Sequence, residues 1–359
     1  MTLDQRDIEL LRLAGKYRWL PYKGLGKFGF GSGLADEIGI LSTAGLMKIS
    51  QDKSYIRPTP QGCRILLNHG HDYGPGSDRP YTSVSSLRRR LEVSSIMLTA
   101  LRAGIDVLLD DIEALSRQPS FFPAFDLRNG GTNMMSAASC AGFGHWGDKG
   151  YMLQYVSPES CGMYLTNELT QLRNMSAIFD PALNAPLAMI FAGPRYGDVY
   201  KQLTANTPSA RHGKHSFYDY WDVYRKTDMP IHLLSCDETG AGQLALMRQP
   251  DYNARIARAA LGDAWIPYDE QIPDADGCLG GDPLVIAADM DVRRVQRVCA
   301  AARELGRGKV MIAAFKSQIN EFYAEILPDD SFIKRLSISQ PILDKAFGNG
   351  FSLYSMESD

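Results

Sequence analysis

Apolar side chains recur every three or four positions in two segments near the start of the chain, residues 2–17 and 32–47. This spacing places them on one face of a helix, so each segment is predicted to be an amphipathic helix. Strand-forming residues then flank a polar centre at Ser50–Ser54, which predicts two short strands joined by a turn. A further helix is predicted to begin at Thr59 and Pro60, because threonine can cap a helix and proline is tolerated at its first position.

The order of these elements divides the chain into three parts. The predicted order is three helices, of which the second is a short segment that ends near Phe28, then a two-stranded hairpin and a closing helix. This order is typical of a winged helix-turn-helix, which we assign to residues 1–70. A linker rich in glycine and proline at 71–80 begins a helical connector over 71–118. Strand-like and helical patterns alternate over 119–359 and predict a partly parallel sheet. We therefore expect an α/β protein in which a winged helix-turn-helix precedes a larger mixed α/β domain.

Composition and charge narrow the class of protein. The 359 residues are 45% hydrophobic and contain no run of about 20 apolar residues, so we expect a cytoplasmic protein without a membrane partner. The six cysteines are scattered and form no C-x-x-C pair, which predicts reduced thiols and no structural zinc. Residues 1–90 contain 14 basic and 8 acidic residues, a net charge of +6, whereas residues 91–359 have a net charge of −9. This asymmetry indicates that a polyanion binds the first segment.

Basic side chains gather around the predicted hairpin and the start of the connector. We expect them to contact the phosphates of double-stranded DNA, with the helix at 32–47 in the major groove. These residues are Lys23, Lys27, Lys53, Arg57, Arg88, Arg89 and Arg90. Asp36 and Glu37 near the start of that helix, which contains no arginine, favour contacts with phosphates and groove shape over base readout. The alternative is a winged helix that serves only protein contacts, with the arginine run as a solvated helix start.

Three carboxylates of the chain are candidates for a nuclease site. A nuclease of the restriction-endonuclease type brings two or three carboxylates and a lysine to a divalent cation, with a Glu-x-Lys pair at a strand end. The candidates are Asp126, Asp148 and Glu168. Thr170 stands where the lysine of Glu-x-Lys is needed. We therefore expect a domain without nuclease activity and no cofactor, and Mg²⁺ or Mn²⁺ only if the nuclease alternative holds.

A second group with metal-ligand spacing is His212, His215 and Asp219. Aromatic residues surround it on both sides along the chain. An aromatic face that packs into a core or against a partner is more common than a metal site, so no metal is predicted here.

Several motifs resemble a known protein family. L-D-x-R-D-x-E-L-L at residues 3–11, L-x-x-x-G-L at 41–46, and Tyr55 followed by T-P-x-G at 59–62 are similar to the replication-relaxation proteins of bacterial plasmids and integrative conjugative elements. The segment FFPAFDLRN at 121–129 is similar to the downstream region of this family. The resemblance implies a winged helix before a domain of restriction-endonuclease-like fold, and a role in plasmid replication or DNA mobilisation.

Together these patterns lead to one functional expectation and two alternatives. We expect a DNA-binding accessory or initiator protein of a mobile genetic element, without catalytic activity. Its expected partners are double-stranded DNA, a relaxase or replication protein, and a second copy of the chain. One alternative is a metal-dependent nuclease. The other is a transcriptional regulator or adaptor whose second domain binds a ligand or a partner.

Overall fold

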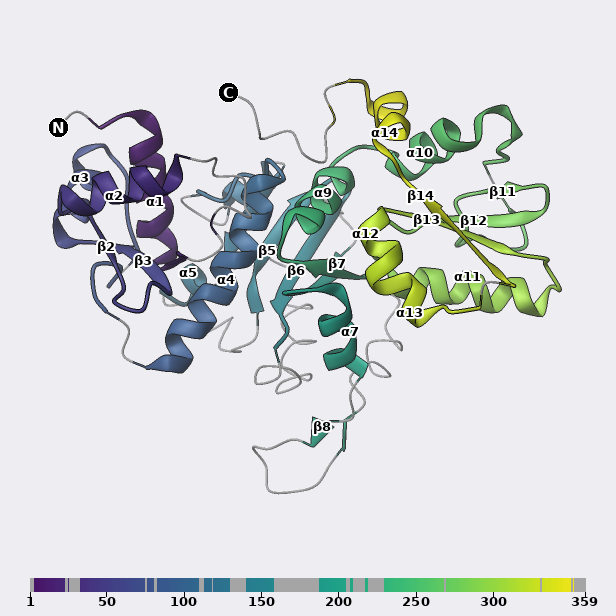
Figure 1. The fold of residues 1–359 in the computed structure, drawn as a ribbon, viewed down its shortest axis with the longest axis horizontal. Coiled ribbons are helices and arrows are strands. Elements are labelled where there is room, and N and C mark those ends of the chain that lie inside the picture. The colour runs from purple at the N-terminus through teal and green to yellow at the C-terminus, as the bar shows by residue number, and fades with distance from the viewer. Residues whose placement is uncertain are drawn as a thin grey trace. The chain divides into compact units, whose positions relative to one another are not determined.

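The protein has a mixed α/β fold with several mixed sheets, seen in a computed structural model (Figure 1). The structure describes residues 3–22, 25, 33–74, 76–80, 83–109, 113–117, 119–129, 140–157, 187–204, 207–208, 217–218, 229–267, 269–329, 331–349 and 351. Contacts along the chain divide it into two compact units. Unit 1 holds the described residues up to His145, and unit 2 holds those from Trp146 onward.

Unit 1 begins with helices around a small antiparallel sheet. The elements are α1 (Gln5–Tyr17), β1 (Leu20–Pro21), α2 (Leu34–Thr43), β2 (Met47–Ile49), β3 (Tyr55–Pro58) and α3 (Pro60–Asn68). The strand order is β1-β3-β2, and both pairs are antiparallel. The two predicted amphipathic helices, the hairpin around Ser50–Ser54 and the helix after Thr59 are all confirmed, with slightly shorter bounds. Thr59 caps α3 by accepting a hydrogen bond of 3.1 Å from the amide of Gly62.

The apolar faces of these elements meet in one core. Leu11 of α1, Leu41 of α2, Ile56 of β3 and Leu66 of α3 are all 0% exposed. A Cβ atom on Gly62 would lie 2.2 Å from the carbonyl oxygen of Leu46, so only glycine allows α3 to approach the start of β2 this closely.

The rest of unit 1 packs on this core. It comprises α4 (Val84–Arg102), η2 (Glu113–Ser116), β4 (Ser120–Pro123), α5 (Ala124–Asn129) and β5 (Cys140–Trp146), with β4 and β5 antiparallel. The predicted linker at 71–80 lies inside this unit, because the Ser77 hydroxyl and the Gly74 amide both bond the carbonyl of Gly15. Ser94 of α4 likewise donates a hydrogen bond of 2.7 Å to the carbonyl of Trp19. The contacts thus divide the chain well after the linker predicted at 71–80.

Unit 2 contains two sheets with parallel strands. In the first, β6 (Lys149–Tyr155), β7 (Leu187–Gly193) and β10 (Ile231–Ser235) run parallel, with β7 in the middle. In the second, β12 (Asp282–Ile286), β13 (Val310–Ala314) and β14 (Ile333–Ser337) run parallel, and β11 (Cys278–Leu279) pairs antiparallel with β12. A short antiparallel pair joins β8 (Thr207–Pro208) to β9 (Phe217–Tyr218). The predicted alternation of strands and helices with a partly parallel sheet is confirmed.

Helices cover both sheets of unit 2. They are α7 (Tyr196–Thr204), α9 (Glu238–Met247), α10 (Tyr252–Leu261), η5 (Gly262–Ala264), α11 (Val292–Glu304), α12 (Lys316–Gln318), η6 (Ile319–Tyr323), α13 (Ala324–Ile326) and α14 (Gln340–Phe347). Figure 1 shows α10 and α14 side by side next to the second sheet, and their apolar residues share a core with alternate residues of β12 and β13. Within the described ranges, no helix combines the length and the apolar content that a membrane crossing needs.

Candidate nucleic-acid interface

Four arginine side chains line one cavity of about 320 Å³ in unit 1. They are Arg18, directly after α1, Arg79, between α3 and α4, and Arg89 and Arg90, in the first half of α4. The described residues that line this cavity include no aspartate or glutamate. Guanidinium groups stay charged at any physiological pH, so they bring positive charge to the lining of the cavity. Two of these four, Arg89 and Arg90, are among the predicted phosphate contacts.

Arg18 has an unusual backbone conformation. Its φ is 71° and its ψ is −50°, and the amide of Trp19 bonds the carbonyl of Tyr17 at 2.9 Å across it. These values describe the γ-turn form that is rare and strained for a residue with a side chain. The Arg18 Nε atom is buried and has no hydrogen-bond partner in the part of the chain that the structure describes. Burial also lowers the pKa of Arg18 from its ordinary value, because the protein solvates the guanidinium charge less well than water does, and Asp126 opposes this shift.

Asp126 follows the cavity-lining Phe125 in the chain and interacts with two of the arginines. Its carboxylate is 3.4 Å from the Lys16 Nζ atom. Burial raises the pKa of Asp126, and Lys16, Arg90 and Arg18 lower it in part. The Arg90 guanidinium stacks 3.9 Å from the ring centroid of Phe125, next to Asp126 in α5. This carboxylate, predicted as a nuclease ligand, thus serves as a counter-charge for basic side chains.

The hairpin of β2 and β3 carries a second group of basic residues. Lys48 and Lys53 are exposed, and Lys53 lies in the turn with a φ of 53°. A second hollow along the hairpin is lined by Lys48, Asp52 and Pro80, among others. Pro80 also lines the arginine cavity, so the two hollows adjoin. Asp52 is the acidic residue on this surface, and hydrogen bonds from Ser50 and Ser54 hold its pKa below the ordinary value.

Arg57, a predicted phosphate contact, is turned into unit 1. The residue is 9% exposed, although it pairs in register with the exposed Lys48. Its Nη1 atom donates to the carbonyl of Asp78, and to that of Pro58 at 3.2 Å. The segment after α3 covers most of Arg57 here, so the guanidinium satisfies backbone carbonyls, and only a small part of the residue reaches the hollow along the hairpin.

Replacing Arg57 with methionine is expected to lower the free energy of unfolding by about 1–3 kcal/mol, because buried carbonyls lose their donor. Duplex affinity of the folded variant should stay within about twofold, since the residue is almost fully buried and its guanidinium already bonds backbone carbonyls. Urea denaturation and a binding titration measure the two effects separately. A loss of affinity at unchanged stability would instead mean that the guanidinium reaches the DNA.

The other predicted site residues are distributed as follows. Arg88 is exposed and lies 3.9 Å from Glu92, one turn further along α4. Asp148 is an exposed turn residue 2.9 Å from Lys149, and it belongs to unit 2, whereas Asp126 belongs to unit 1. Lys23, Lys27, Glu168, Thr170, His212, His215 and Asp219 lie outside the described residues. Among the described residues, no group of three or more His, Cys, Asp or Glu side chains is placed to hold a metal ion.

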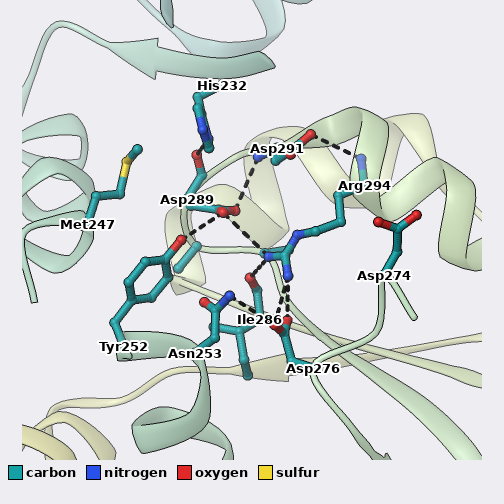
Figure 2. A network of polar contacts seen from close by, with 12 residues as sticks. His232, Met247, Tyr252, Asn253, Asp274, Asp276, Ile286, Asp289, Asp291 and Arg294 are labelled. Carbon is teal, nitrogen blue, oxygen red and sulfur yellow. Dashed lines mark hydrogen bonds and ion pairs between the residues drawn. The ribbon is translucent and has the colours of Figure 1, made fainter. Parts of the chain in front are cut away.

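Unit 2 contains a buried network of charges that the sequence did not predict (Figure 2). The Arg294 guanidinium donates hydrogen bonds of 2.8 and 2.7 Å to the Asp276 carboxylate and one of 2.6 Å to the carbonyl of Ile286. The Asp289 carboxylate lies 3.4 Å from the same guanidinium and accepts a hydrogen bond of 2.8 Å from the Tyr252 hydroxyl. The three charged side chains are only 14%, 11% and 6% exposed for Arg294, Asp276 and Asp289.

Burial and pairing oppose one another in this network. Burial raises the pKa of Asp276, and the attraction of Arg294 offsets it only in part. Burial also raises the pKa of Asp289, but the positive charge of Arg294 and the hydrogen bond from the Tyr252 hydroxyl lower it further, so that it lies below its ordinary value. Burial disfavours the charge of Arg294, yet the two carboxylates raise its pKa above the ordinary value. These charges therefore compensate one another inside unit 2.

The network also fixes the loop that follows β12. The carbonyl of Asp289 accepts hydrogen bonds from the Gln243 amide and from the His232 ring, both 2.9 Å long, with His232 Nδ1 taken as the donor. Met290 has a φ of 57°, and its carbonyl accepts the amide of Leu233 at 3.2 Å. The loop therefore runs beside β10 and is bonded to it. In the sequence, the only indication of this site is an acidic pair placed directly after an apolar strand.

Comparison with protein-family models, with curated proteins and with solved structures gives no match for this chain. The side chains themselves must therefore indicate the function. In the unit 2 network, positive and negative groups are paired with one another. In unit 1, four arginines line one hollow and Lys48 of the hairpin lines the adjoining one.

Proposed function

We propose that unit 1 is a winged helix-turn-helix that binds the phosphate backbone of double-stranded DNA, and that the chain is an accessory or initiator protein of a mobile genetic element. One observation supports this most strongly: the exposed Lys48 of the hairpin lines a hollow that adjoins a cavity with four arginines, and Lys53 is exposed in the hairpin turn. The order of helices and strands, with β1 paired to β3, fits this fold. The mobile-element role, and a restriction-endonuclease-like fold for unit 2, rest on the sequence resemblance.

Contacts to phosphate are favoured over base readout by the surface of α2, the expected recognition helix. Its exposed positions are Ala35, Asp36, Ile40 and Thr43. The helix has no lysine or arginine to reach a guanine edge, and Asp36 repels phosphate. Affinity must then come from the hairpin and the cavity, which contact any sequence alike. A relaxase, a replication protein or a second copy of the chain would then provide the specificity for a particular DNA sequence.

The test is a salt titration of binding to a short duplex. Each phosphate contact contributes about 0.9 to the magnitude of the slope of log affinity against log salt concentration. The double variant Lys48→Glu, Lys53→Glu loses two contacts, so the magnitude of its slope should be smaller by about 2. At about 100 mM salt its affinity should fall at least tenfold, for duplexes of unrelated sequence alike. Fluorescence anisotropy with a labelled duplex gives both values.

Lys201→Glu provides the matched control, because Lys201 is an exposed lysine on α7 of unit 2. It should change the affinity by less than about twofold, since it makes no expected phosphate contact. The proposal fails if the full chain shows no salt-dependent binding, or if Lys201→Glu weakens binding as much as the hairpin variant does.

A further inference from the structure

We propose that the arginine cavity of unit 1 binds a terminal phosphate, a phosphomonoester carried by a group of nucleotide size. The inference rests on the proposed function and deepens it, because it names the group that the cavity would take beside the hairpin. Two sources have this chemistry, the phosphorylated end of a DNA strand and a free nucleotide. In both, the ligand presents a phosphate with three unesterified oxygens.

The charge of the cavity favours a monoester over a backbone diester. Four guanidinium groups line it, the described lining residues include no carboxylate, and Asp126 interacts with Arg18 and Arg90. A phosphomonoester has about −1.5 to −2 charges near neutral pH, against a single charge for a backbone phosphate. Arginine also matches phosphate geometry, because its planar fork can donate two parallel hydrogen bonds.

Arg18 supplies an independent observation. Its Nε atom is buried and lacks a hydrogen-bond partner in the described chain, and its backbone is held in the strained γ-turn form. Glycine would adopt this turn without strain. Strained residues with a side chain cluster at binding sites, where the side chain is needed in one place. A phosphate in the cavity would place an anion against the part of the Arg18 side chain that lines it.

The size and the walls of the cavity fit more than a bare phosphate. Its volume of about 320 Å³ lies at the lower end of the range of small-molecule sites, about 300–1,000 Å³. Val93, Phe125 and Ala141 contribute apolar surface to its lining. Apolar walls with a few convergent charged groups are typical of sites for small organic ligands. The sugar or base next to the phosphate would contact these walls.

The first experiment compares thymidine 5′-monophosphate, inorganic phosphate and thymidine by calorimetric titration of the full chain. We expect the monophosphate to bind at least tenfold more tightly than thymidine, because charge-assisted hydrogen bonds to phosphate are strong. Inorganic phosphate should bind between the two. Equal binding of thymidine and its monophosphate contradicts a site for a free nucleotide. It contradicts the whole proposal if a single strand with a 5′-phosphate also binds no better than one with a 5′-hydroxyl.

Two variants test the cavity itself. Arg18→Gly should weaken monophosphate binding about tenfold, through loss of one charge-assisted hydrogen bond, while Tm stays unchanged or rises as the γ-turn relaxes. Asp126→Asn should tighten binding about threefold, because a negative charge near Arg18 and Arg90 is removed. A merely structural role of these residues predicts no tightening. If Arg18→Gly does not fold, the Asp126→Asn result decides alone, and unchanged affinity overturns the proposal.

Single strands with a 5′-phosphate or a 5′-hydroxyl distinguish the two sources. Preference for the phosphorylated strand, stronger than for the mononucleotide, identifies a DNA end; the reverse order identifies a free nucleotide. If neither phosphorylated ligand binds better than its hydroxyl counterpart, the inference is wrong. A closed circular duplex has no terminal phosphate, so its binding to the chain tests the proposed function separately.

Discussion

Replacement of Arg294 by methionine is expected to lower the free energy of unfolding of unit 2 by about 3–5 kcal/mol. Methionine keeps most of the volume of the side chain but removes its charge and its donors. Asp276 and Asp289, whose side chains are only 11% and 6% exposed, would then lose the cation that both contact. The carbonyl of Ile286 would lose its donor as well. A buried carboxylate without a partner must either stay charged at a high cost or take up a proton.

Arg297→Met, on the same helix, is the matched control. Arg297 contacts Asp274 at 2.7 Å, but the two side chains are 48% and 39% exposed. A solvent-exposed ion pair of this kind contributes about 0–1 kcal/mol. Urea denaturation, followed by hydrogen exchange of β12 and β13 amides, measures the stability of unit 2 in each variant. Equal losses for the two variants would mean that the buried network is no stronger than a surface ion pair.

Gly240→Ala is expected to destabilise unit 2 by about 3 kcal/mol, at the upper end of the range for overpacking. Gly240 lies in the first turn of α9, where its amide donates a hydrogen bond of 3.0 Å to the cap residue Asp237. A Cβ atom at this position would lie 1.8 Å from the carbonyl oxygen of Ser235. A backbone carbonyl at the end of β10 cannot rotate away, so α9 would have to shift from the sheet.

The control for this prediction is Gly197→Ala in the first turn of α7. There the nearest atom to an added Cβ is the carbonyl oxygen of Glu321, at an ordinary contact distance of 3.9 Å. Alanine has the higher helix propensity, so the change should be neutral or stabilise unit 2 by up to about 1 kcal/mol. Thermal unfolding of the two variants gives opposite shifts in Tm if the close approach at Gly240 decides. A lower Tm for both would point to a general effect of the substitution.

Local patterns were sufficient to predict the first helices and the hairpin of unit 1, but not β1, β4 or β5. The helices over 2–17 and 32–47, the hairpin and the cap at Thr59 all follow from periodicity and capping chemistry, which depend on residues close in sequence. The same reasoning could not place Arg57. The alternation of residues along a strand predicts which side chains share a face of the hairpin. It does not predict that the segment at 76–80 covers the face on which Arg57 lies.

The arginine cavity of unit 1 and the charge network of unit 2 show more clearly why local patterns do not predict such sites. Arg89 and Arg90 form a run that is visible in the sequence, but Arg18 and Arg79 reach the same cavity from separate segments. In unit 2, Tyr252, Asp276 and Arg294 come from different elements and meet only through packing. Long-range contacts of this kind follow from the tertiary fold and not from spacing along the chain.

The bonds between the loop after β12 and strand β10 have a consequence for the way unit 2 loses its structure. Leu233 of the first sheet is held by the carbonyl of Met290, and the carbonyl of the neighbouring Asp289 holds Gln243 of α9. Neither sheet can open at this edge without breaking bonds that belong to the other. The two layers should therefore behave as one cooperative folding unit, so partial opening that frees one sheet and spares the other is disfavoured.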